Sequence, residues 1–339
     1  MKRIKVFLAL VLVVTSLCML AACGKSAGSN TDDIATAPAG SANQNSDHEI
    51  SIGVIQLAPH VALDSSYEGF LEALSERGYV EGENLHLDYN NAQGDPSNAT
   101  TIAQKLVNAK PDLIFAIATQ AAQAAANQTS DIPIVITAVT NPQESGLVKS
   151  NEKPETNVTG TSDLTPVAEQ LELIKRIMPD AKRVGVIFSS SEDNSLIQAK
   201  MAQEKLTEMG LEYVELTVSK TDEITPVVQS AMGKIDVLYT PTDNLVSANM
   251  TAVTNVTTPA GVPVICGEVG MLEGGGLLTL GVDYHKLGLQ AGQMAADILE
   301  GKAKPQDMPI QTQKDLEFVV NEDLAKQLEI TIPDDLLKK

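Results

Sequence analysis

The chain has 339 residues, with 24 Lys and Arg against 44 Asp and Glu, so its formal net charge at pH 7 is −20. This charge argues against DNA or RNA as a partner, because nucleic acids bind mainly through cationic side chains. The hydrophobic share of 43% suffices for two cores, whereas 3% aromatic residues and no Trp leave few rings for stacking. The three Cys have no spacing typical of a disulfide scaffold or a zinc site.

Residues 1–22 have the pattern of a secretory signal. Cations at positions 2, 3 and 5 precede the apolar run 6–14, which is too short to span a bilayer comfortably. The end of this segment, Leu20-Ala21-Ala22-Cys23, resembles the lipobox of bacterial lipoproteins. That resemblance implies cleavage after Ala22 and diacylation of the Cys23 sulfur, and two acyl chains anchor a protein stably in a membrane. The alternatives are a simple signal peptide cleaved nearby and an uncleaved anchor helix.

The segment that follows has almost nothing to bury. Residues 23–48 contain the Cys that would carry the lipid and then mainly small and polar residues, so we expect a flexible tether there. No later hydrophobic stretch is long enough to cross a membrane. The sequence therefore predicts a folded body, beginning at residue 49, tethered outside the cytoplasmic membrane.

From residue 49 onward, short β-rich runs alternate with amphipathic helical patterns. We expect strands at 50–55, 85–89, 112–118 and 133–138, and helices at 67–77, 98–108 and 120–127. Near-continuous apolar strands that alternate with helices are typical of a parallel sheet covered on both faces.

The pattern then repeats in the same order. The strand runs return at 183–187, 211–218, 235–239 and 261–265. Residues 158–163 would cross between two units, and a return near Asp283 would lead into a helix at 287–299. The sequence therefore predicts an α/β fold of two similar Rossmann-like lobes, joined by hinge crossings, with a ligand cleft between them. Lobe one would comprise 49–161 plus about 284–310, and lobe two 162–283 plus about 311–339.

This arrangement resembles the type I periplasmic-binding-protein fold, and seven short motifs narrow the resemblance. They are similar to those of solute-binding lipoproteins from tryptophan and tyrosine type ABC importers, and they lie at Gly53-Val54-Ile55-Gln56, Leu63-Asp64, Ala92-Gln93-Gly94-Asp95, Ile117-Ala118-Thr119-Gln120-Ala121-Ala122, Gly160-Thr161-Ser162-Asp163, Ser190-Ser191-Glu192-Asp193-Asn194-Ser195 and Thr242-Asp243-Asn244. The resemblance implies an extracytoplasmic receptor for an amino acid, often an aromatic one. Such a receptor delivers its cargo to a membrane permease driven by a cytoplasmic ATPase.

Candidate ligand-binding residues follow from the strand ends, because open α/β sheets bind ligands beyond the carboxyl ends of their strands. The candidates are mostly hydroxyls, amides and carboxylates, without a cationic side chain. They are Gln56, Asp64, Thr119, Gln120, Thr137, Ala138, Ser162, Ser189, Glu192, Asn194, Asp243, Glu268 and Asp283.

These residue types suit a zwitterion. Hydroxyls and free N–H groups at a helix N-terminus can hold an α-carboxylate, as expected at Thr119 with Thr137 and Ala138 beside it. Asp243, aided by Glu192, would accept hydrogen bonds from the α-ammonium. Opposite ends of one ligand would then join opposite lobes.

Helix capping is a competing interpretation of several candidates. Thr119, Asn194 and Asp243 suit helix N-caps, and Ser189 followed three residues later by Glu192 matches a capping box. Asp163, just ahead of Leu164-Thr165-Pro166, fits a turn as well as it fits a ligand contact.

The sequence contains few of the motifs that indicate an enzyme. The His residues at 48, 60, 86 and 285 show no spacing for a metal, and neither a Gly-x-Ser-x-Gly elbow nor a Walker A loop is present. A polar loop explains His60 and Asp64 as well as a general base pair does. We therefore expect a monomer without a cofactor or metal, with a permease as partner. A ligand sensor for a different small polar solute is the alternative.

Overall fold

The computed structural model of the protein describes residues 49–337. The predicted signal peptide, the lipobox with Cys23 and the tether lie outside the described residues. In the part of the chain that is described, no helix combines the length and the apolar character needed to cross a membrane.

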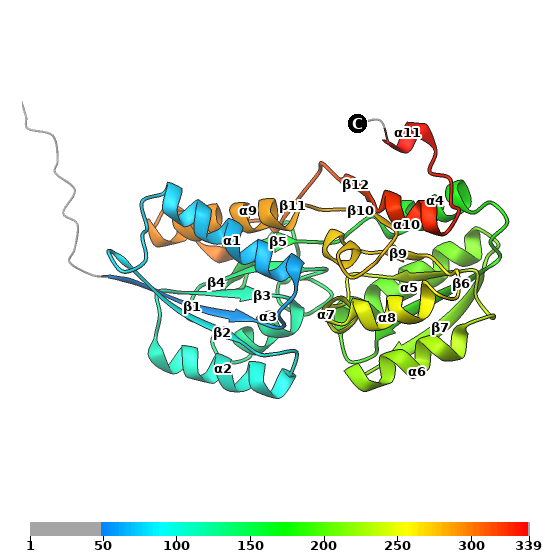
Figure 1. The fold of residues 1–339 in the computed structure, drawn as a ribbon. Helices are drawn as coiled ribbons and strands as arrows, with labels where there is room; N and C mark the ends of the chain where they lie inside the picture. Colours follow the sequence, from blue (N-terminus) through cyan, green and yellow to red (C-terminus); the bar gives the residue numbers. More distant parts are fainter. Residues whose placement is uncertain (1–48, 338–339) are drawn as a thin grey trace, which may run out of the picture. The chain divides into compact units, whose positions relative to one another are not determined.

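The first lobe is built on a parallel sheet. Its strands are β1 (Ile50–Gln56), β2 (Leu85–Asn91), β3 (Leu113–Ile117), β4 (Ile134–Val139), β5 (Val158–Ser162) and β11 (Gln311–Thr312), in the order β11-β5-β4-β3-β1-β2. All pairings between these strands are parallel. One face is covered by α1 (Val61–Glu76) and α9 (Tyr284–Leu299), and the other by α2 (Pro96–Ala109) and α3 (Thr119–Ala126) (Figure 1).

The second lobe repeats this arrangement. Its strands are β6 (Arg183–Ser189), β7 (Glu212–Val218), β8 (Val237–Thr240), β9 (Val264–Cys266), β10 (Leu278–Gly281) and β12 (Glu317–Val320), in the order β12-β10-β9-β8-β6-β7. Its helices are α4 (Val167–Ile177), α5 (Asp193–Glu208), α6 (Thr221–Ala231), α7 (Asn244–Ala248), α8 (Met250–Thr257), α10 (Glu322–Gln327) and α11 (Asp334–Leu337), with the short 3-10 helix η1 (Val269–Leu272). A second 3-10 helix, η2 (Pro305–Asp307), packs against β5 of the first lobe. The two sheets have matching strand orders, which confirms the predicted fold class.

The strand β12 runs antiparallel to β10, although the sequence pattern indicated parallel sheets. The direction follows from the path of the chain. β11 runs parallel to β5 in the first sheet, so its end lies at the edge that faces the second lobe. The short link from β11 to β12 therefore enters the second sheet at the carboxyl end of β10, and β12 can only run away from it.

Three connections join the lobes. They run from β5 to α4, from β10 to α9, and from β11 to β12. Residues 158–162 of the predicted crossing 158–163 form β5 within the first sheet, so the first link begins at Asp163, and the second passes through Asp283. Residues 311–312 pair with β5 of the first sheet, although the sequence predicts them in lobe two.

A glycine recurs at the same place in the first strand of each sheet. A Cβ added to Gly53 would lie 3.0 Å from the Leu106 side chain, and one added to Gly185 would lie 2.9 Å from Ile235. Both glycines therefore let an apolar side chain pack directly on the strand. The repeat seen in the sequence thus reflects a shared packing requirement in a core cluster of each lobe.

The helices α1 and α9 approach each other closely in the first lobe. A Cβ on Gly69 would lie 2.0 Å from the His285 carbonyl oxygen, and one on Gly288 would lie 2.0 Å from the Ser66 carbonyl oxygen. Only glycine permits this contact. It fixes the N-terminal ends of the two helices, which carry His60 and Tyr284, beside the junction of the lobes.

Candidate functional site

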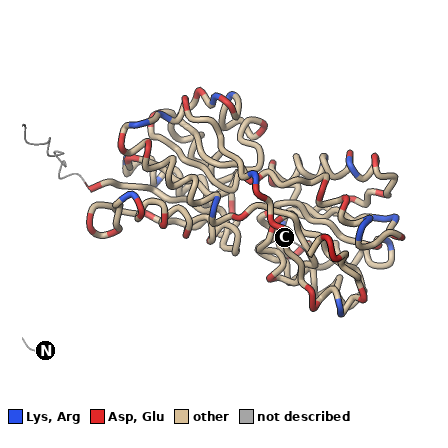
Figure 2. The backbone as a smooth tube through the Cα atoms, turned by 90° about the horizontal axis from the view of Figure 1, so that it is seen from above, with Lys and Arg blue, Asp and Glu red and all other residues tan. Residues whose placement is uncertain are grey.

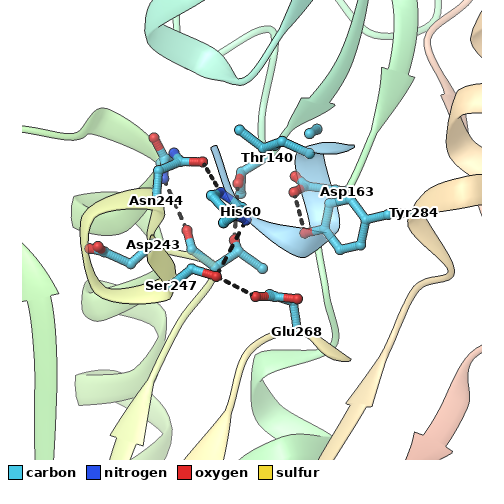
Figure 3. A pocket seen from close by; sticks show the side chains of 12 residues that line it. His60, Thr140, Asp163, Asp243, Asn244, Ser247, Glu268 and Tyr284 are labelled. Atoms are coloured by element: carbon cyan, nitrogen blue, oxygen red, sulfur yellow. Dashed lines mark hydrogen bonds between the residues drawn. The ribbon is translucent and has the colours of Figure 1, made fainter. Parts of the chain in front are cut away.

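The carboxyl ends of the strands of both sheets converge on a small polar cavity, which we call the inner cavity. Lobe one and the crossings contribute His60, Leu63, Ala138, Thr140, Asp163 and Tyr284; lobe two contributes Asn194, Thr242, Asp243, Asn244, Ser247 and Glu268. Figure 3 labels eight of these side chains and shows His60 of lobe one between Asn244 and Ser247 of lobe two. The cavity volume is about 10 Å³, close to the space that one water molecule needs.

A larger outer cavity lies beside the inner one, also between strand ends of the two lobes. Its volume is about 320 Å³, which falls within the range of small-molecule sites. Asn244 lines both cavities. The outer cavity is lined by Leu57, Ala58, Pro59, Gln93, Gly94, Pro96, Gln120, Ser191, Glu192, Ser219, Thr221, Asn244, Leu245, Ala248 and Asn249.

Hydrogen bonds between uncharged groups join the two lobes at these cavities. His60 Nε2 lies 3.2 Å from Asn244 Oδ1, and its Nδ1 lies 3.4 Å from the Ser247 hydroxyl (Figure 3). Gln120 donates a 2.7 Å hydrogen bond to the Ser191 carbonyl oxygen. Burial lowers the pKa of His60 to about 4, so the imidazole is neutral at pH 7.

The site is rich in buried carboxyl groups and poor in compensating charge. Asp163, Glu192, Asp243 and Glu268 are each at most 4% exposed, and no Lys or Arg is among the described residues that line either cavity. Acidic residues are spread over both lobes as well (Figure 2). What distinguishes the site is that its carboxyl groups are buried and have, within residues 49–337, no cationic side chain beside them.

Burial raises the pKa of every one of these carboxyl groups, since the charged form is poorly solvated between the lobes. The pKa of Glu268 rises to about 7, although hydrogen bonds from Ser247 and Gly270 oppose the shift. Burial and the neighbouring charge of Asp243 raise the pKa of Glu192 to about 7. The pKa values of Asp163 and Asp243 also rise through burial. A cation in this site would be favoured.

Two of the acids hold the start of α7. Asp243 is its N-cap: its Oδ1 accepts from the Val246 N–H at 2.8 Å, and its Oδ2 accepts from the Ser189 N–H at 2.5 Å. Glu192 Oε1 accepts from the Leu245 N–H at 3.0 Å and its Oε2 from the Asn244 N–H at 3.2 Å. The capping interpretation of Asp243 is thus met, and both of its oxygens are already occupied by backbone donors.

Asp163 has an oxygen without a partner. The Tyr284 hydroxyl donates to its Oδ2 at 2.7 Å (Figure 3), whereas its Oδ1 is buried and has no hydrogen bond. Asn194 Oδ1 is also buried without a partner at the inner cavity. Buried acceptors without donors are costly, so these two atoms mark where a donor would bind most favourably.

The beginning of α3 offers the opposite polarity. Thr119 is its first residue, is 1% exposed, and its Oγ1 has no hydrogen-bond partner. It is not the N-cap, because that position belongs to Ala118, whose φ is 83°. Ala138, at the end of the neighbouring strand, has a φ of 55°. Non-glycine residues in this region are strained, and such strain gathers at functional sites.

The other predicted candidates lie around the cavities without lining them. Gln56 donates to Asp64 Oδ1 at 2.6 Å, and Thr137 accepts from the Thr161 hydroxyl inside the sheet. Ser162 donates to the Thr140 carbonyl oxygen, Ser189 contacts Ser191, and Asp283 caps α9 while it pairs with Lys286. The structure brings together Ala138, Asn194, Asp243 and Glu268 at the inner cavity and Gln120 and Glu192 at the outer one.

Several lining residues were missed in the list of candidates. His60 and Ser247 lie within helical stretches or loops next to strand ends, and Tyr284 follows the return that the sequence did identify. The signal for Tyr284 was its place after Asp283 at a crossing. The sequence suggests for His60 a general base pair with Asp64 or a place in a polar loop, and neither interpretation makes it a ligand contact. Within the described residues, no group of three or more His, Cys, Asp or Glu is arranged to hold a metal ion.

Two α/β lobes, joined by three crossings and with acidic and hydroxyl side chains at their strand ends, define the type I periplasmic-binding-protein fold. The chain belongs to the family of ABC transporter substrate binding proteins, whose family model matches residues 51–339. Proteins of this family are extracytoplasmic, and they bind solutes rather than catalyse reactions. The predicted family and class of function are thereby confirmed.

Similar proteins carry more specific names. A tyrosine-binding protein of Clostridioides difficile (strain R20291) is 42% identical over 331 residues, which cover 97% of this chain and 93% of the relative. An ABC domain from Streptococcus pneumoniae, solved in complex with L-Trp, is 36% identical with a TM-score of 0.83, covering 86% of this chain and 98% of that one. The ligand-free, open structure of a Clostridium difficile substrate binding protein with adhesive properties is 45% identical with a TM-score of 0.66, covering 84% and 97%.

The superposition is better on the L-Trp complex than on the ligand-free, open structure, although the sequence is more similar to the latter. The overall arrangement of this chain is thus more similar to that of the L-Trp complex.

Proposed function

We propose that this protein is the receptor of an ABC importer for an amino acid, with L-tyrosine and L-tryptophan as the first candidates. The observation that carries the proposal is the polarity of the cleft. Buried carboxyl groups without a cation gather at the inner cavity, and an unpartnered hydroxyl at a helix start lies nearby. The names of the two similar proteins, one tyrosine-binding and one solved with L-Trp, support this class of ligand.

The α-ammonium group binds at the inner cavity in this proposal. Asp163 supplies the free oxygen Oδ1, and Glu268 faces the same cavity from the other lobe. Asp243, the acceptor expected from the sequence, already binds two backbone N–H groups, so it acts mainly by holding α7. A bound ammonium would thus connect a crossing of lobe one with lobe two.

The α-carboxylate binds at the start of α3. Free backbone N–H groups and the helix dipole favour an anion at a helix N-terminus. The Thr119 hydroxyl adds a buried donor without a present partner. Gln120, in the same turn, lines the outer cavity and contacts lobe two, so this turn lies at the cleft.

The side chain of the amino acid occupies the outer cavity. Its walls include Leu57, Pro59, Pro96, Leu245 and Ala248, and its rim carries polar side chains. None of the described residues that line it is aromatic. An aromatic ligand would therefore be held by aliphatic contacts, with the rim available for the phenol of tyrosine or the indole N–H of tryptophan.

The remaining parts of the proposal concern the membrane. The lipobox around Cys23 supports a lipid anchor at the outer face of the cytoplasmic membrane, and residues 23–48 would serve as its tether. The monomer would deliver its cargo to a permease, and the ATPase would act on the permease from the cytoplasm.

A thermal-shift screen of the common L-amino acids tests the function. A ligand that binds the folded protein alone raises the Tm, by an amount that grows with its concentration over Kd. We expect L-tyrosine, L-tryptophan or both to give the largest shift, and their N-acetyl and amide derivatives to give much smaller ones. The proposal is wrong if no amino acid shifts the Tm while a sugar or another uncharged solute does.

A further inference from the structure

Glu268 occupies an unusual electrostatic position between the lobes. It is 2% exposed, and its two oxygens accept from the Ser247 hydroxyl at 2.6 Å and from the Gly270 N–H at 2.5 Å. Neither donor carries a charge. No Lys or Arg is among the described residues that line its cavity.

The titratable groups around Glu268 do not supply a positive charge either. The His60 imidazole is neutral at pH 7 because burial lowers its pKa to about 4, and the Asp163 carboxyl, when ionised, would repel a second anion. The titratable side chains that line the cavity with Glu268 are His60, Asp163, Asp243 and Tyr284, and the Cys266 thiol in β9 also interacts with it.

The burial of Glu268 depends on both lobes. It is the N-cap of η1 in lobe two, and η1 packs against α1 of lobe one. A Cβ on Gly270 would lie 3.1 Å from Val61 Cβ, which shows how closely the two lobes approach there. When the lobes separate, water reaches Glu268 and solvates its charge. An ionised Glu268 therefore opposes closure, whereas a protonated one does not.

An acidic cluster alone would not identify a ligand. Here a second observation points to one, because the inner cavity also contains the buried and unpartnered Asp163 Oδ1. A proton or an ammonium group would compensate the buried charge of Glu268 and could donate to Asp163 Oδ1. We propose that closure of the unliganded cleft takes up a proton at Glu268, and that the ammonium group of the ligand replaces this proton. The second half of the proposal rests on the proposed amino-acid function.

The sign of the effect follows from linkage. The pKa of Glu268 is about 7 in the closed form, against an ordinary value of 4.5 for an exposed Glu. The closed form binds more protons in this range, so the ratio of closed to open protein rises as the pH falls from about 7 toward 4.5. For one proton the ratio changes by up to tenfold per pH unit.

The first experiment needs no ligand. Spin labels at Ser97→Cys and Asp222→Cys, both exposed, would lie on opposite sides of the outer cavity in the first turns of α2 and α6. Distances between the labels are measured on the full chain in detergent at pH 8 and pH 5.5, with the chain lacking both substitutions as the labelling control. We expect shorter distances at pH 5.5 in the wild type and short distances at both pH values in Glu268→Gln.

Glu273→Gln is the matched control, because Glu273 is exposed and follows the same 3-10 helix. It should respond to pH like the wild type. The proposal is overturned if the wild-type distances are the same at both pH values, or if Glu268→Gln keeps the wild-type response.

The second experiment tests the exchange with the ammonium group. L-tyrosine and L-tryptophan are titrated calorimetrically at pH 6 in two buffers that differ in ionisation enthalpy. Wild type should release up to about one proton per ligand, and Glu268→Gln close to none. Binding without proton release would refute the exchange and leave the proposed function standing. Failure of both ligands to bind would count against the proposed function, while the label distances would still decide the closure.

Discussion

The Tyr284 hydroxyl donates a 2.7 Å hydrogen bond to Oδ2 of Asp163, and the two residues belong to different crossings between the lobes. Asp163 follows β5, where the chain first leaves lobe one, and Tyr284 begins α9, where the chain returns. Both side chains are buried and line the inner cavity. One hydrogen bond therefore joins two of the crossings between the lobes at the proposed binding site.

Tyr284→Phe should destabilise the protein and weaken ligand binding. The change removes the donor that Asp163 Oδ2 has in Tyr284, and a buried acceptor that loses its donor costs about 1–3 kcal/mol. Denaturant unfolding measures the loss, and calorimetry measures the affinity. Tyr239→Phe is the matched control, because the Tyr239 hydroxyl donates a buried 2.7 Å bond to Gln170 within lobe two. It should lower stability and leave the affinity unchanged; equal losses of affinity in both variants would argue against a role of the hinge bond in binding.

Asp163→Asn should lower the affinity for an amino acid by roughly ten- to hundredfold, since a hydrogen bond to a charged group is worth about 1.5–3 kcal/mol. N-acetylation removes the positive charge of the ligand's α-ammonium group, so it deletes the same charge pair. The two changes together should cost less than their sum, because both delete one interaction. Calorimetry of the four combinations provides the measurement, and full additivity would place the ammonium group elsewhere. Thr119→Val removes a donor to the α-carboxylate of the ligand. Replacing this carboxylate by an amide should therefore lower the affinity less in the variant than in the wild type.

Gly69→Ala should destabilise lobe one, although alanine favours a helix more than glycine does. The added Cβ would lie 2.0 Å from the His285 carbonyl oxygen, so α1 and α9 must move apart. Overpacking of this kind costs about 1–3 kcal/mol. Ser65→Ala, at a half-buried position of the same helix, should change the unfolding free energy little. An unfolding free energy equal to that of wild type would show that the helices adjust without cost.

Stability should depend on pH through Glu268. Its pKa in the folded protein is about 7, above the ordinary 4.5, so its contribution to stability is fully present below about pH 4.5 and is lost as the pH rises through 7. Glu268→Gln should therefore raise the unfolding free energy relative to wild type at pH 8 more than at pH 5. Urea unfolding at the two pH values measures this difference, and a constant offset between the proteins would contradict it.

Cys23→Ala tests the lipid anchor. The variant has no sulfur for acylation, so the protein should be released from the membrane fraction or keep its signal segment. Cell fractionation followed by intact-mass analysis distinguishes these results. Cys266→Ala is the control, because Cys266 is a buried thiol in β9 and should not affect anchoring. A processed Cys23→Ala protein held at the membrane like the wild type would refute the lipoprotein hypothesis.

Much of the fold could be predicted because local sequence patterns indicate its strands and helices. Apolar strands such as 50–55 and 183–187 recur with the same glycine, and the packing that requires this glycine is the same in both lobes. The crossings near Asp163 and Asp283 follow from the same repeat. The direction of β12 was not predictable, because it depends on the edge at which the chain re-enters the second sheet.

The sequence by itself determined the fold class and which strand ends would face the cleft. The tertiary structure alone decided the role of each side chain there. Asp243 and Asp163 are both acids beyond strand ends, yet two backbone N–H groups occupy Asp243, whereas Asp163 keeps one buried oxygen free. The partners of a buried polar atom come from segments distant in sequence, such as Ser189 and Tyr284. No local pattern records which of those segments arrives within hydrogen-bond distance.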